Sequence, residues 1–503
     1  MSLISLDIGT SGMRAVVYGK NGHKGKSAYY EYHTYFPQEG YVEQDPETWR
    51  DTAIKCLRDI AHVFKDFGEA PEAITVTSQR SSLIPMKDGK PLHPAIMWQD
   101  KRTLGQCAEL IEKYTLEGLY RLTGLRTNPY FVLPKILWLR ENKPEIYHAT
   151  EKFIGVQDYV VYCLTGEYRT DCSQACRTML MNIETFEWEP ELLEIAGITE
   201  DRLPELLPPG SIAGTVTPEM EALTGIDAGV PVILAGGDQQ NAAVALGVLK
   251  SGRAEANTGT GSFVISALDH PVFDKQARVL CQASAIAGQW IMEAGIFNTG
   301  ATYRWFKERF CQDLNEVDDV YGHLNAESAS SAVGANGVIM IPHFEGSAAP
   351  YWNPFAKGLF FNLSLKTTRG DMIRALMEGI AVEINDNISL IEELTGKIDR
   401  VSVAGGMVRS DLFCDIQSYI FNKEVARYKN SEASSLGAAM IAYVTLGYYK
   451  NIEEAYEKML GNNSPMVFAP NADSVVKSRK IIERKHKLYD GLKASGVYEA
   501  FSE

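Results

Sequence analysis

Residues 4–18 of the sequence read ISLDIGTSGMRAVVY, which is a hydrophobic stretch, a polar turn and a second hydrophobic stretch. This pattern predicts two neighbouring β-strands with a tight connection. The connection contains two glycines and two small hydroxyl residues, with Asp7 just before it, although a two-residue Asn-Gly turn would suffice for a hairpin. The turn is therefore either an elaborate hairpin loop or a ligand site, and the rest of the sequence has to decide between them.

The segments that follow predict an α/β domain. Residues 26–36 (KSAYYEYHTYF) are rich in aromatics and roughly alternating, as in a third strand. A helix is predicted to begin at Asp45 and Pro46, a good N-cap followed by a residue suited to the first helical position. Residues 73–79 (AITVTSQ) then predict a buried strand. Three strands, a helix and another strand imply a sheet with an antiparallel start.

The opening theme returns in the middle of the chain. Residues 229–247 predict a buried strand, a Gly-Gly-Asp turn and a helix of small residues. Residues 252–268 (GRAEANTGTGSFVISAL) then repeat the order of strand, glycine-threonine turn and strand. Two such hairpins, each starting one half of the chain, suggest two related domains that face each other. We therefore expect a boundary near Leu246, with one domain at residues 1–246 and another at residues 247–503.

The second half contains a further candidate site for a nucleotide. A helix with capping-box spacing between Thr368 and Asp371 comes first and is interpreted as a core helix. Residues 401–421 (VSVAGGMVRSDLFCDIQSYIF) predict a strand that ends in two glycines, followed by a helix capped by Ser410. Glycines between a strand and a helix N-terminus let the backbone approach a nucleotide closely. Residues from about 472 to 495 predict a charged helix without a chemical signal.

Composition narrows the range of functions. The 503 residues, 45% hydrophobic and 22% charged, are typical of a globular protein with two domains. The formal net charge of -15 argues against a nucleic-acid partner, because binding a phosphate backbone requires clustered Lys and Arg. The eight cysteines are scattered without a paired framework, which favours a reducing cytoplasm. Asp7 would interrupt a signal peptide and no run of about 18 apolar residues occurs, so neither export nor a membrane anchor is expected.

The polar residues at these turns match the requirements of phosphoryl transfer, which are N–H donors around the phosphates, a carboxylate-bound metal and a base at the accepting hydroxyl. The two glycine-threonine turns can direct N–H and hydroxyl groups at phosphate oxygens. Asp7, at the end of the first strand, lies where a magnesium ion would be held. Asp238, between Gly237 and Gln239 at the end of the central strand, is the candidate base, and a helix N-cap is its alternative role.

Eight segments, in this order, resemble the FGGY family of carbohydrate kinases, relatives of actin and of the heat-shock chaperone ATPases. They are LDIGTSGMRAVVY, GYVEQDPETW, MWQDKRT, AGGDQQ, NTGTGSF, PYWNPFAKG, VAGGMVRSDLF and EASSLGAA, and the match runs from about residue 3 to about residue 460. Each segment alone is weak, but the ordered set is specific. The resemblance implies an α/β fold of two ribonuclease H-like (actin-like ATPase) domains flanking a deep catalytic cleft, with sugar binding in the N-terminal domain and ATP binding mainly in the C-terminal one.

The resemblance also implies a role for each matching residue. Asp7 would organise Mg²⁺ together with Asp238, and Asp238 would accept the proton of the substrate hydroxyl as its oxygen attacks the γ-phosphorus in line. The residues implied to bind ATP are Gly9, Thr10, Ser11 and Arg14 at the first turn, Gly259 and Thr260 at the second, Gly300 and Arg304 in NTGATYRW, and Gly405, Gly406 and Ser410 at the adenosine-binding turn.

Within the family, the chain is most similar to glycerol kinases. The positions implied to contact the substrate are Arg80, Ser81, Trp98, Tyr130, Asp238, Gln239 and Phe263. Arg80 and Gln239 would form hydrogen bonds, and the three aromatic rings would pack on the carbon chain. Ser81 departs from the pattern, because glycerol kinases carry glutamate there, and loss of that charged acceptor should weaken glycerol binding by about 1.5–3 kcal/mol unless it is replaced. The Met-His pair typical of xylulokinases is also absent from this place.

The sequence therefore predicts an ATP- and Mg²⁺-dependent kinase acting on a hydroxyl of a small polyol or ketose, with glycerol, a four- or five-carbon polyol and xylulose all open as substrates. One alternative is a sugar-binding or chaperone-like ATPase of the actin superfamily, and another is a sugar sensor that no longer phosphorylates. Asp238 and its polar and aromatic surroundings argue against the first, and the intact Asp7, Thr10 and Asp238 argue against the second. A cytoplasmic location is expected, without nucleic-acid or membrane partners, and the oligomeric state is left open, with a homodimer or homotetramer considered.

Overall fold

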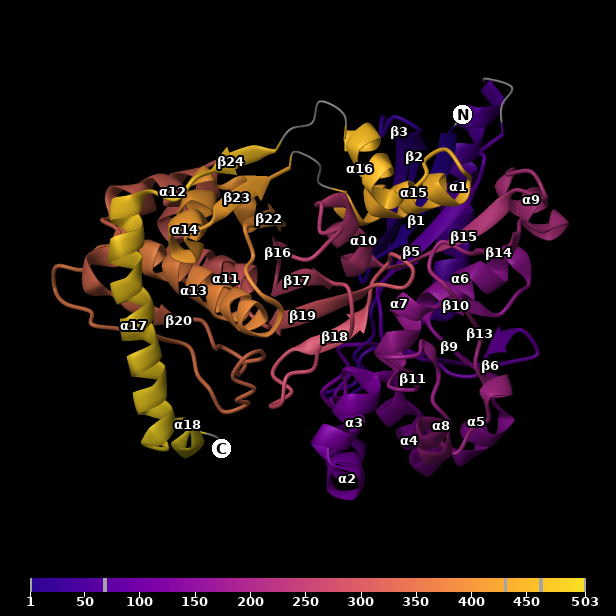
Figure 1. Cartoon of the computed structure of the whole chain (residues 1–503), viewed down its shortest axis with the longest axis horizontal. Coiled ribbons are helices and arrows are strands. Elements are labelled where there is room, and N and C mark those ends of the chain that lie inside the picture. The colour runs from indigo at the N-terminus through magenta and orange to yellow at the C-terminus, as the bar shows by residue number, and fades with distance from the viewer. Residues whose placement is uncertain (1, 67–69, 429–431, 461–464, 502–503) are drawn as a thin grey trace. The chain divides into compact units, whose positions relative to one another are not determined.

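The computed structural model describes residues 2–66, 70–428, 432–460 and 465–501. The chain divides into two compact units, whose segments alternate along the sequence (Figure 1). Unit 1 comprises Met1–Leu249, Leu268–Ile291 and Glu432–Asn462, and unit 2 comprises Lys250–Ala267, Met292–Ser431 and Asn463–Glu503.

Unit 1 is built on a six-stranded mixed sheet, in the order β14-β15-β5-β1-β2-β3. Its strands are β1 (Ser2–Ile8), β2 (Gly12–Gly19), β3 (Lys24–Glu31), β5 (Ile74–Ser78), β14 (Ile212–Thr215) and β15 (Pro231–Gly237). Strand β1 pairs antiparallel with β2 and parallel with β5, and β5 pairs parallel with β15. The sheet thus has the antiparallel start that the sequence predicts, and the quoted stretch forms its first hairpin.

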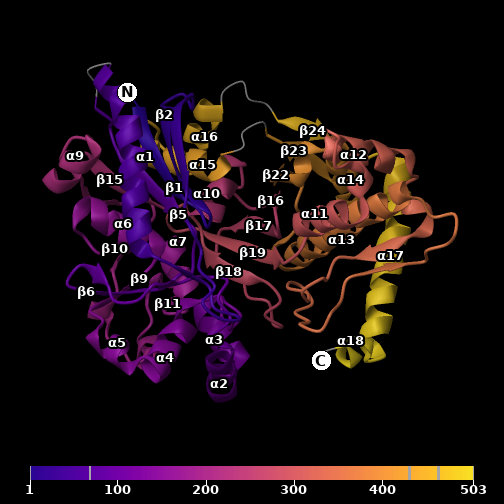
Figure 2. The ribbon, with the colours of Figure 1, turned by 180° about the vertical axis from the view of Figure 1, so that it is seen from behind.

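Helices cover both faces of this sheet, as Figures 1 and 2 show. Successive side chains of a strand point to opposite faces. Ile4 and Leu6 of β1 lie in one core with α1 (Pro46–Asp66), whereas Leu3 lies in a second core with α15 (Ala433–Thr445). Burial of both faces explains why neighbouring residues of this strand, such as Leu3 and Ile4, are both apolar. Helix α1 begins where the sequence predicts.

The other elements of unit 1 are short and surround the sheet. Helix α10 (Asp238–Ala245) follows β15 directly and packs against α15. The rest are β4 (Glu43–Gln44), β6 (Ile84–Lys87), β7 (Lys90–Pro91), β8 (Ala95–Ile96), α2 (Leu104–Tyr114), α3 (Leu116–Thr123), α4 (Val132–Asn142), α5 (Pro144–Ala149), β9 (Lys152–Ile154), α6 (Val156–Thr165), β10 (Arg169–Asp171), α7 (Cys172–Ala175), β11 (Met181–Asn182), β12 (Glu187–Trp188), α8 (Pro190–Ala196), β13 (Glu205–Leu207), α9 (Pro218–Thr224) and α16 (Ile452–Leu460).

Unit 2 repeats the order of pairing around its own hairpin. Its strands lie in the order β19-β17-β16-β22-β23-β24. These strands are β16 (Arg253–Thr258), β17 (Ser262–Leu268), β19 (Trp290–Ile296), β22 (Arg400–Ala404), β23 (Glu424–Arg427) and β24 (Met466–Phe468), whereas β18 (Leu280–Ala283) belongs to unit 1. Strand β16 pairs antiparallel with β17 and parallel with β22, which pairs parallel with β23. The two glycine-threonine hairpins therefore occupy corresponding places in the two sheets.

The helices of unit 2 include the three that the sequence predicts there: α13 (Arg369–Thr395), the helix capped by Ser410 (α14, Asp411–Phe421) and α17 (Ala472–Ala494). The long helix α13 is largely buried, and its predicted capping box is present: Thr368 Oγ1 accepts from the Asp371 amide at 3.2 Å, and Asp371 Oδ2 accepts from the Thr368 amide at 2.9 Å. The predicted charged helix is α17. The other elements are α11 (Gly300–Phe310), α12 (Val320–Ser330), β20 (Ile339–Ile341), β21 (Leu359–Phe361) and α18 (Val497–Ala500). Within the described ranges, no helix is both long and apolar enough to cross a bilayer.

Candidate active site

Three parallel strands of unit 1 end side by side and bring the predicted residues together. In the sheet register, Ile8 of β1 lies opposite Ser78 of β5, which lies opposite Gly237 of β15. The residues that follow these three are the first glycine-threonine turn, the segment from Gln79 to Ser81, and Asp238. The carboxyl ends of parallel strands share one edge of a sheet, where ligands of open α/β sheets bind. The site therefore follows from the sheet topology.

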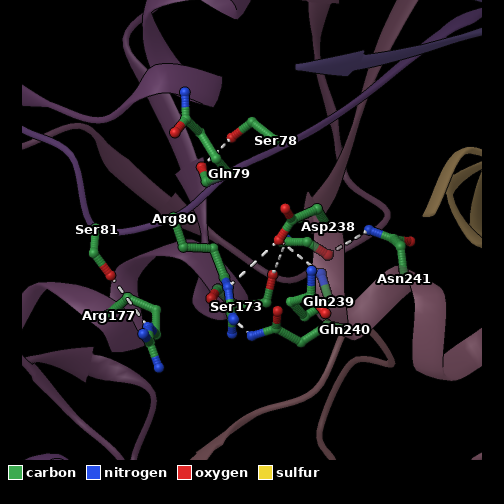
Figure 3. Close-up of polar contacts among 12 residues, drawn as sticks. Ser78, Gln79, Arg80, Ser81, Ser173, Arg177, Asp238, Gln239, Gln240 and Asn241 are labelled. Atoms are coloured by element: carbon green, nitrogen blue, oxygen red, sulfur yellow. Dashed lines mark hydrogen bonds and ion pairs between the residues drawn. The ribbon is translucent and has the colours of Figure 1, made fainter. Parts of the chain in front are cut away.

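Asp238 is the first residue of α10, and Figure 3 shows its carboxylate turned toward Arg80. The N-cap of α10 is Gly237, so Asp238 does not have the alternative N-cap role. One oxygen, Oδ1, accepts from the backbone N–H of Gln239 at 2.7 Å and lies 3.6 Å from Arg80 Nε. The Asp238 side chain keeps 22% exposure. The carboxylate is thus held in one orientation while part of it faces solvent.

Arg80 is fixed between two partners of unit 1. Its Nη1 donates to Gln282 Oε1 at 3.2 Å, while Nε faces Asp238. A side chain at Gly237 would collide with this arrangement, because a Cβ there would lie 2.6 Å from Arg80 Cδ and 2.3 Å from Gln240 Oε1. Glycine before the candidate base is therefore a steric requirement for placing Arg80.

Asp7 lies on β1 beside the same edge. Its pKa is raised to about 7, first because the surrounding protein desolvates the carboxyl and second because Asp238 carries a like charge, while Arg14 opposes the shift. Within the described residues there is no cluster of three or more metal-ligating side chains. Magnesium commonly uses only one or two protein carboxylates and completes its coordination with water and phosphate oxygens. Two carboxylates that repel each other therefore fit Mg²⁺.

The turn after β1 is held by side chains from several parts of unit 1. The amide of Gly9 donates to the carbonyl of Gly12 at 3.0 Å, and the Tyr32 hydroxyl also donates to the Gly9 carbonyl. Thr10 Oγ1 donates to Gln79 Oε1 at 3.2 Å. Gln44 Nε2 donates to the Thr10 carbonyl at 2.8 Å. Gln44 and Gln79 were not predicted as site residues, although Gln44 lies in the segment GYVEQDPETW and the register of the strand ends could have suggested Gln79.

Ser11 is exposed, and Arg14 has a partner of its own. Arg14 Nη1 forms an ion pair with Glu432 at 2.9 Å, and its guanidinium carbon lies 4.8 Å from the Tyr29 ring centroid. Lys24 pairs with the same glutamate at 2.7 Å. Arg14 therefore has Glu432 as a partner within unit 1, and its contact with the phosphates stays a prediction.

Ser81 faces a buried arginine. Its Oγ accepts from Arg177 Nε at 3.2 Å, and its carbonyl accepts from Lys135 Nζ at 2.5 Å. Burial lowers the pKa of Lys135 to about 7, although Asp100 opposes the shift. Ser81 has φ of 69°, in the left-handed region that favours glycine. Arg177 and Lys135 were not predicted, yet Lys135 interrupts the apolar run VLPKILWL, which is a signal that could have identified it.

Trp98 and Tyr130 form one half-buried aromatic pair. Their ring centroids are 4.9 Å apart and the planes are tilted by 40°. Arg177 lies over the Tyr130 ring at 5.2 Å, and Lys135 Nζ donates to the Tyr130 carbonyl at 2.9 Å. Gln239 is also half-buried. Unit 1 thus brings together all the predicted substrate residues except Phe263, which lies on β17 of unit 2.

The predicted nucleotide residues of unit 2 also cluster. Strands β16 and β22 run parallel with Asn257 opposite Ala404, so the Gly259 turn and Gly405 follow neighbouring strand ends. The amide of Gly300 donates to the Gly259 carbonyl at 3.0 Å, and a Cβ at Gly300 would lie 2.2 Å from that oxygen. These contacts make close backbone packing the reason for glycine at the start of α11.

The predicted nucleotide residues of unit 2 make fewer contacts through their side chains than through their backbone. Arg304 Nη2 reaches Thr260 Oγ1 at 3.5 Å, the limit of a hydrogen bond. Ser410 caps α14 by accepting from the Phe413 amide at 3.3 Å. Gly405 has φ of 96°, whereas Gly406 has helical dihedral angles. The turn before α14 therefore requires glycine at its first position only.

Two family models match the chain in order: the N-terminal domain of the FGGY family of carbohydrate kinases at residues 2–245, and its C-terminal domain at residues 254–446. The chain belongs to this family. It is 32% identical over 500 residues to a glycerol kinase of Thermococcus onnurineus (strain NA1), covering 98% of this chain and 96% of the relative. It is 29% identical over 487 residues to a gluconokinase of Bacillus licheniformis, covering 95% and 94%.

Solved structures of sugar and glycerol kinases share the fold. A ligand-bound xylulose kinase from Lactobacillus acidophilus matches over 100% of both chains with a TM-score of 0.92 and 25% sequence identity. These findings confirm the predicted family, the mixed α/β fold and an ATP-dependent carbohydrate kinase activity. The roles of single residues and the choice of sugar stay predictions.

Proposed function

We propose that this FGGY kinase transfers the γ-phosphate of ATP to a hydroxyl of a small polyol or ketose, with Asp238 as the general base. The substrate hydroxyl would give its proton to Asp238 while its oxygen forms the new bond to the γ-phosphorus and the bond to the β-phosphate oxygen breaks, leaving ADP. The observation that carries this assignment is the oriented, partly exposed carboxylate between Arg80 and the Gln239 amide.

The aromatic pair supports a small, carbon-rich acceptor. Trp98 and Tyr130 are half-buried and offer apolar ring surface to the carbon backbone of a polyol. Gln239 would bind a substrate hydroxyl beside the base, and Phe263 of unit 2 would add a further packing surface. The Ser81 hydroxyl already accepts from Arg177, so its contribution would be an oriented lone pair rather than a charge.

The residues that would hold Mg²⁺ and ATP are proposed from their places at the strand ends and helix starts. Asp7, with Asp238, would hold Mg²⁺, which supplies positive charge to the phosphate oxygens when it is bound. Gly9, Thr10 and Ser11 of unit 1 would face the phosphates. On unit 2, Gly259, Thr260, Gly300, Arg304, Gly405, Gly406 and Ser410 would bind ATP, because they cluster at neighbouring strand ends and at the first residues of α11 and α14.

A cytoplasmic location belongs to the same proposal. None of the eight cysteines, all in the described part of the chain, forms a disulfide. Cysteines without disulfides in a protein of this size fit a reducing compartment.

The test is a turnover assay with ATP and Mg²⁺ on glycerol, erythritol, ribitol, xylitol, xylulose, ribulose, fuculose and gluconate, read as ADP release. With the best acceptor, Asp238→Asn should lower kcat by about 10²- to 10⁴-fold, because the base is lost while the shape is kept. Asp319→Asn is the matched control, since Asp319 only caps α12 and asparagine caps equally well. A folded Asp238→Asn variant with kcat within a fewfold of the parent would show that the base lies elsewhere.

A further inference from the structure

One hydrogen bond joins the turn after β1, which is proposed to face the phosphates, to the aromatic pair of Trp98 and Tyr130, which is proposed to contact the substrate. Trp98 Nε1 donates to Thr10 Oγ1 at 3.1 Å, and the same oxygen donates its proton to Gln79 Oε1 at 3.2 Å. Gln79 Nε2 in turn donates to the Gly9 carbonyl at 3.3 Å. The turn that precedes β2 is therefore tied, through two side chains, to an indole that lies against Tyr130.

The chemistry of these groups gives each bond a direction. An indole N–H can only donate, and a threonine hydroxyl has a single proton, which here goes to Gln79. The indole N–H is thus directed to the turn, while the half-buried ring face is what a substrate carbon chain can contact. One side chain therefore contacts both sites with different parts of its surface.

We propose that Trp98 is a positioning residue that couples sugar binding to ATP binding. Sugar packed on Trp98 and Tyr130 restricts the indole, the indole N–H restricts Thr10, and the ordered turn then binds the phosphates of MgATP more tightly. Coupling of this kind is reciprocal, so MgATP tightens sugar binding by the same factor. A neutral hydrogen bond of this type corresponds to a coupling factor of about two- to tenfold.

This inference rests on the proposed function, and its test uses the best acceptor from the sugar panel. The dissociation constant of the non-hydrolysable analogue AMP-PNP, with Mg²⁺, is measured by calorimetry with and without that acceptor. In the parent protein the acceptor should tighten AMP-PNP about two- to tenfold. In Trp98→Phe, which keeps a ring without the N–H, and in Thr10→Val, which keeps the shape without the hydroxyl, the factor should fall to about one.

The control and the double variant exclude general effects. Trp290→Phe also loses an indole donor, whose bond to the Ile183 carbonyl lies outside this chain of contacts, and it should keep the coupling factor. The double variant Trp98→Phe/Thr10→Val should be no worse than either single one, because both remove the same bond. A factor that persists in either folded single variant, or that is missing from the parent, overturns the inference. If no acceptor in the panel is turned over, the proposed function itself fails.

Discussion

Replacing Ser81 by glutamate should shift the enzyme toward glycerol. Glutamate stands at this position in the glycerol kinases that the sequence resembles, and here the Ser81 hydroxyl lies 3.2 Å from Arg177 Nε. A carboxylate at this place would have the arginine as its counterion and a second oxygen for a substrate hydroxyl. A hydrogen bond to a charged group contributes about 1.5–3 kcal/mol. The kcat/KM of Ser81→Glu on glycerol should therefore be about 10- to 150-fold higher than that of the parent protein.

Two effects could oppose this gain on glycerol, and the structure indicates how large each would be. The left-handed backbone at Ser81 is as unfavourable for glutamate as for serine, so this strain cancels. The second effect is steric, because Ser81 is only 6% exposed and glutamate is larger than serine. A cavity of about 30 Å³, lined in part by Ser81 and Ser82, gives some room for the added atoms. Overpacking of this kind costs about 1–3 kcal/mol of folding stability. We therefore expect a lower melting temperature together with the gain on glycerol.

The assay compares kcat/KM on glycerol and on a five-carbon polyol for the parent, Ser81→Glu and Ser81→Gln. The glutamine variant has nearly the same size without the charge, so it should show the stability loss but little of the glycerol gain. If both variants gain equally, size rather than charge governs the selectivity. If Ser81→Glu melts cooperatively and gains nothing on glycerol, Ser81 does not lie where the substrate hydroxyl binds, and the reasoning is refuted.

Three further predictions follow from the geometry. Gly405→Ala should raise the KM for ATP at least about tenfold, because φ of Gly405 is 96° and the new Cβ would lie 2.3 Å from a carbonyl oxygen. Gly406→Ala is the control, since a Cβ there meets open space and should leave the KM unchanged. Equal KM values for the two variants would refute this prediction. Burial raises the pKa of Asp158 from 3.8 to about 7, so the folded state retains a proton that the unfolded state loses, and stability falls as pH rises through this window. Asp158→Asn should flatten the decline in melting temperature between about pH 4 and pH 7, and an unchanged slope would contradict the shift. Arg80→Lys should lower kcat about 10- to 100-fold, because one ammonium cannot hold both partners that the guanidinium now contacts; activity near the parent's would show that this orientation is dispensable.

Much of the fold could be predicted because local patterns and topology agree. Hydrophobic strands, the helix start at Pro46 and the repeated glycine-threonine turn are all local signals, and the structure shows these elements, although β3 ends at Glu31 and not at the predicted Phe36. The convergence of Asp7 and Asp238 was also predictable, because each lies at the end of a strand and parallel strand ends share an edge. These predictions needed only the order of strands and not their side-chain packing.

The surroundings of Ser81 could not be predicted in the same way. Arg177 lies 96 positions further along the chain and belongs to no motif that names its partner. Lys135 reaches a carbonyl, and every residue has one, so the sequence cannot indicate which carbonyl is chosen. The departure at Ser81 was visible in the sequence, but its meaning depends on the buried guanidinium of Arg177. That side chain belongs to the short helical turn Cys176–Thr178, and only the packing of this turn, α4 and the Ser81 loop reveals the contact.

The two threonines of the repeated turns show how far a motif determines a role. Thr10 and Thr260 are each the middle residue of a three-residue turn, closed by the Gly9 amide on Gly12 and by the Gly259 amide on Gly261. Their hydroxyls nevertheless differ, because that of Thr10 receives the Trp98 N–H and gives its proton to Gln79, whereas that of Thr260 lies at the limit of reach from Arg304. A hydroxyl whose one proton is already donated can offer a phosphate oxygen nothing further. While these bonds persist, the first turn can donate to phosphate through backbone N–H groups and the exposed Ser11, and Thr10 serves instead to hold the turn in shape.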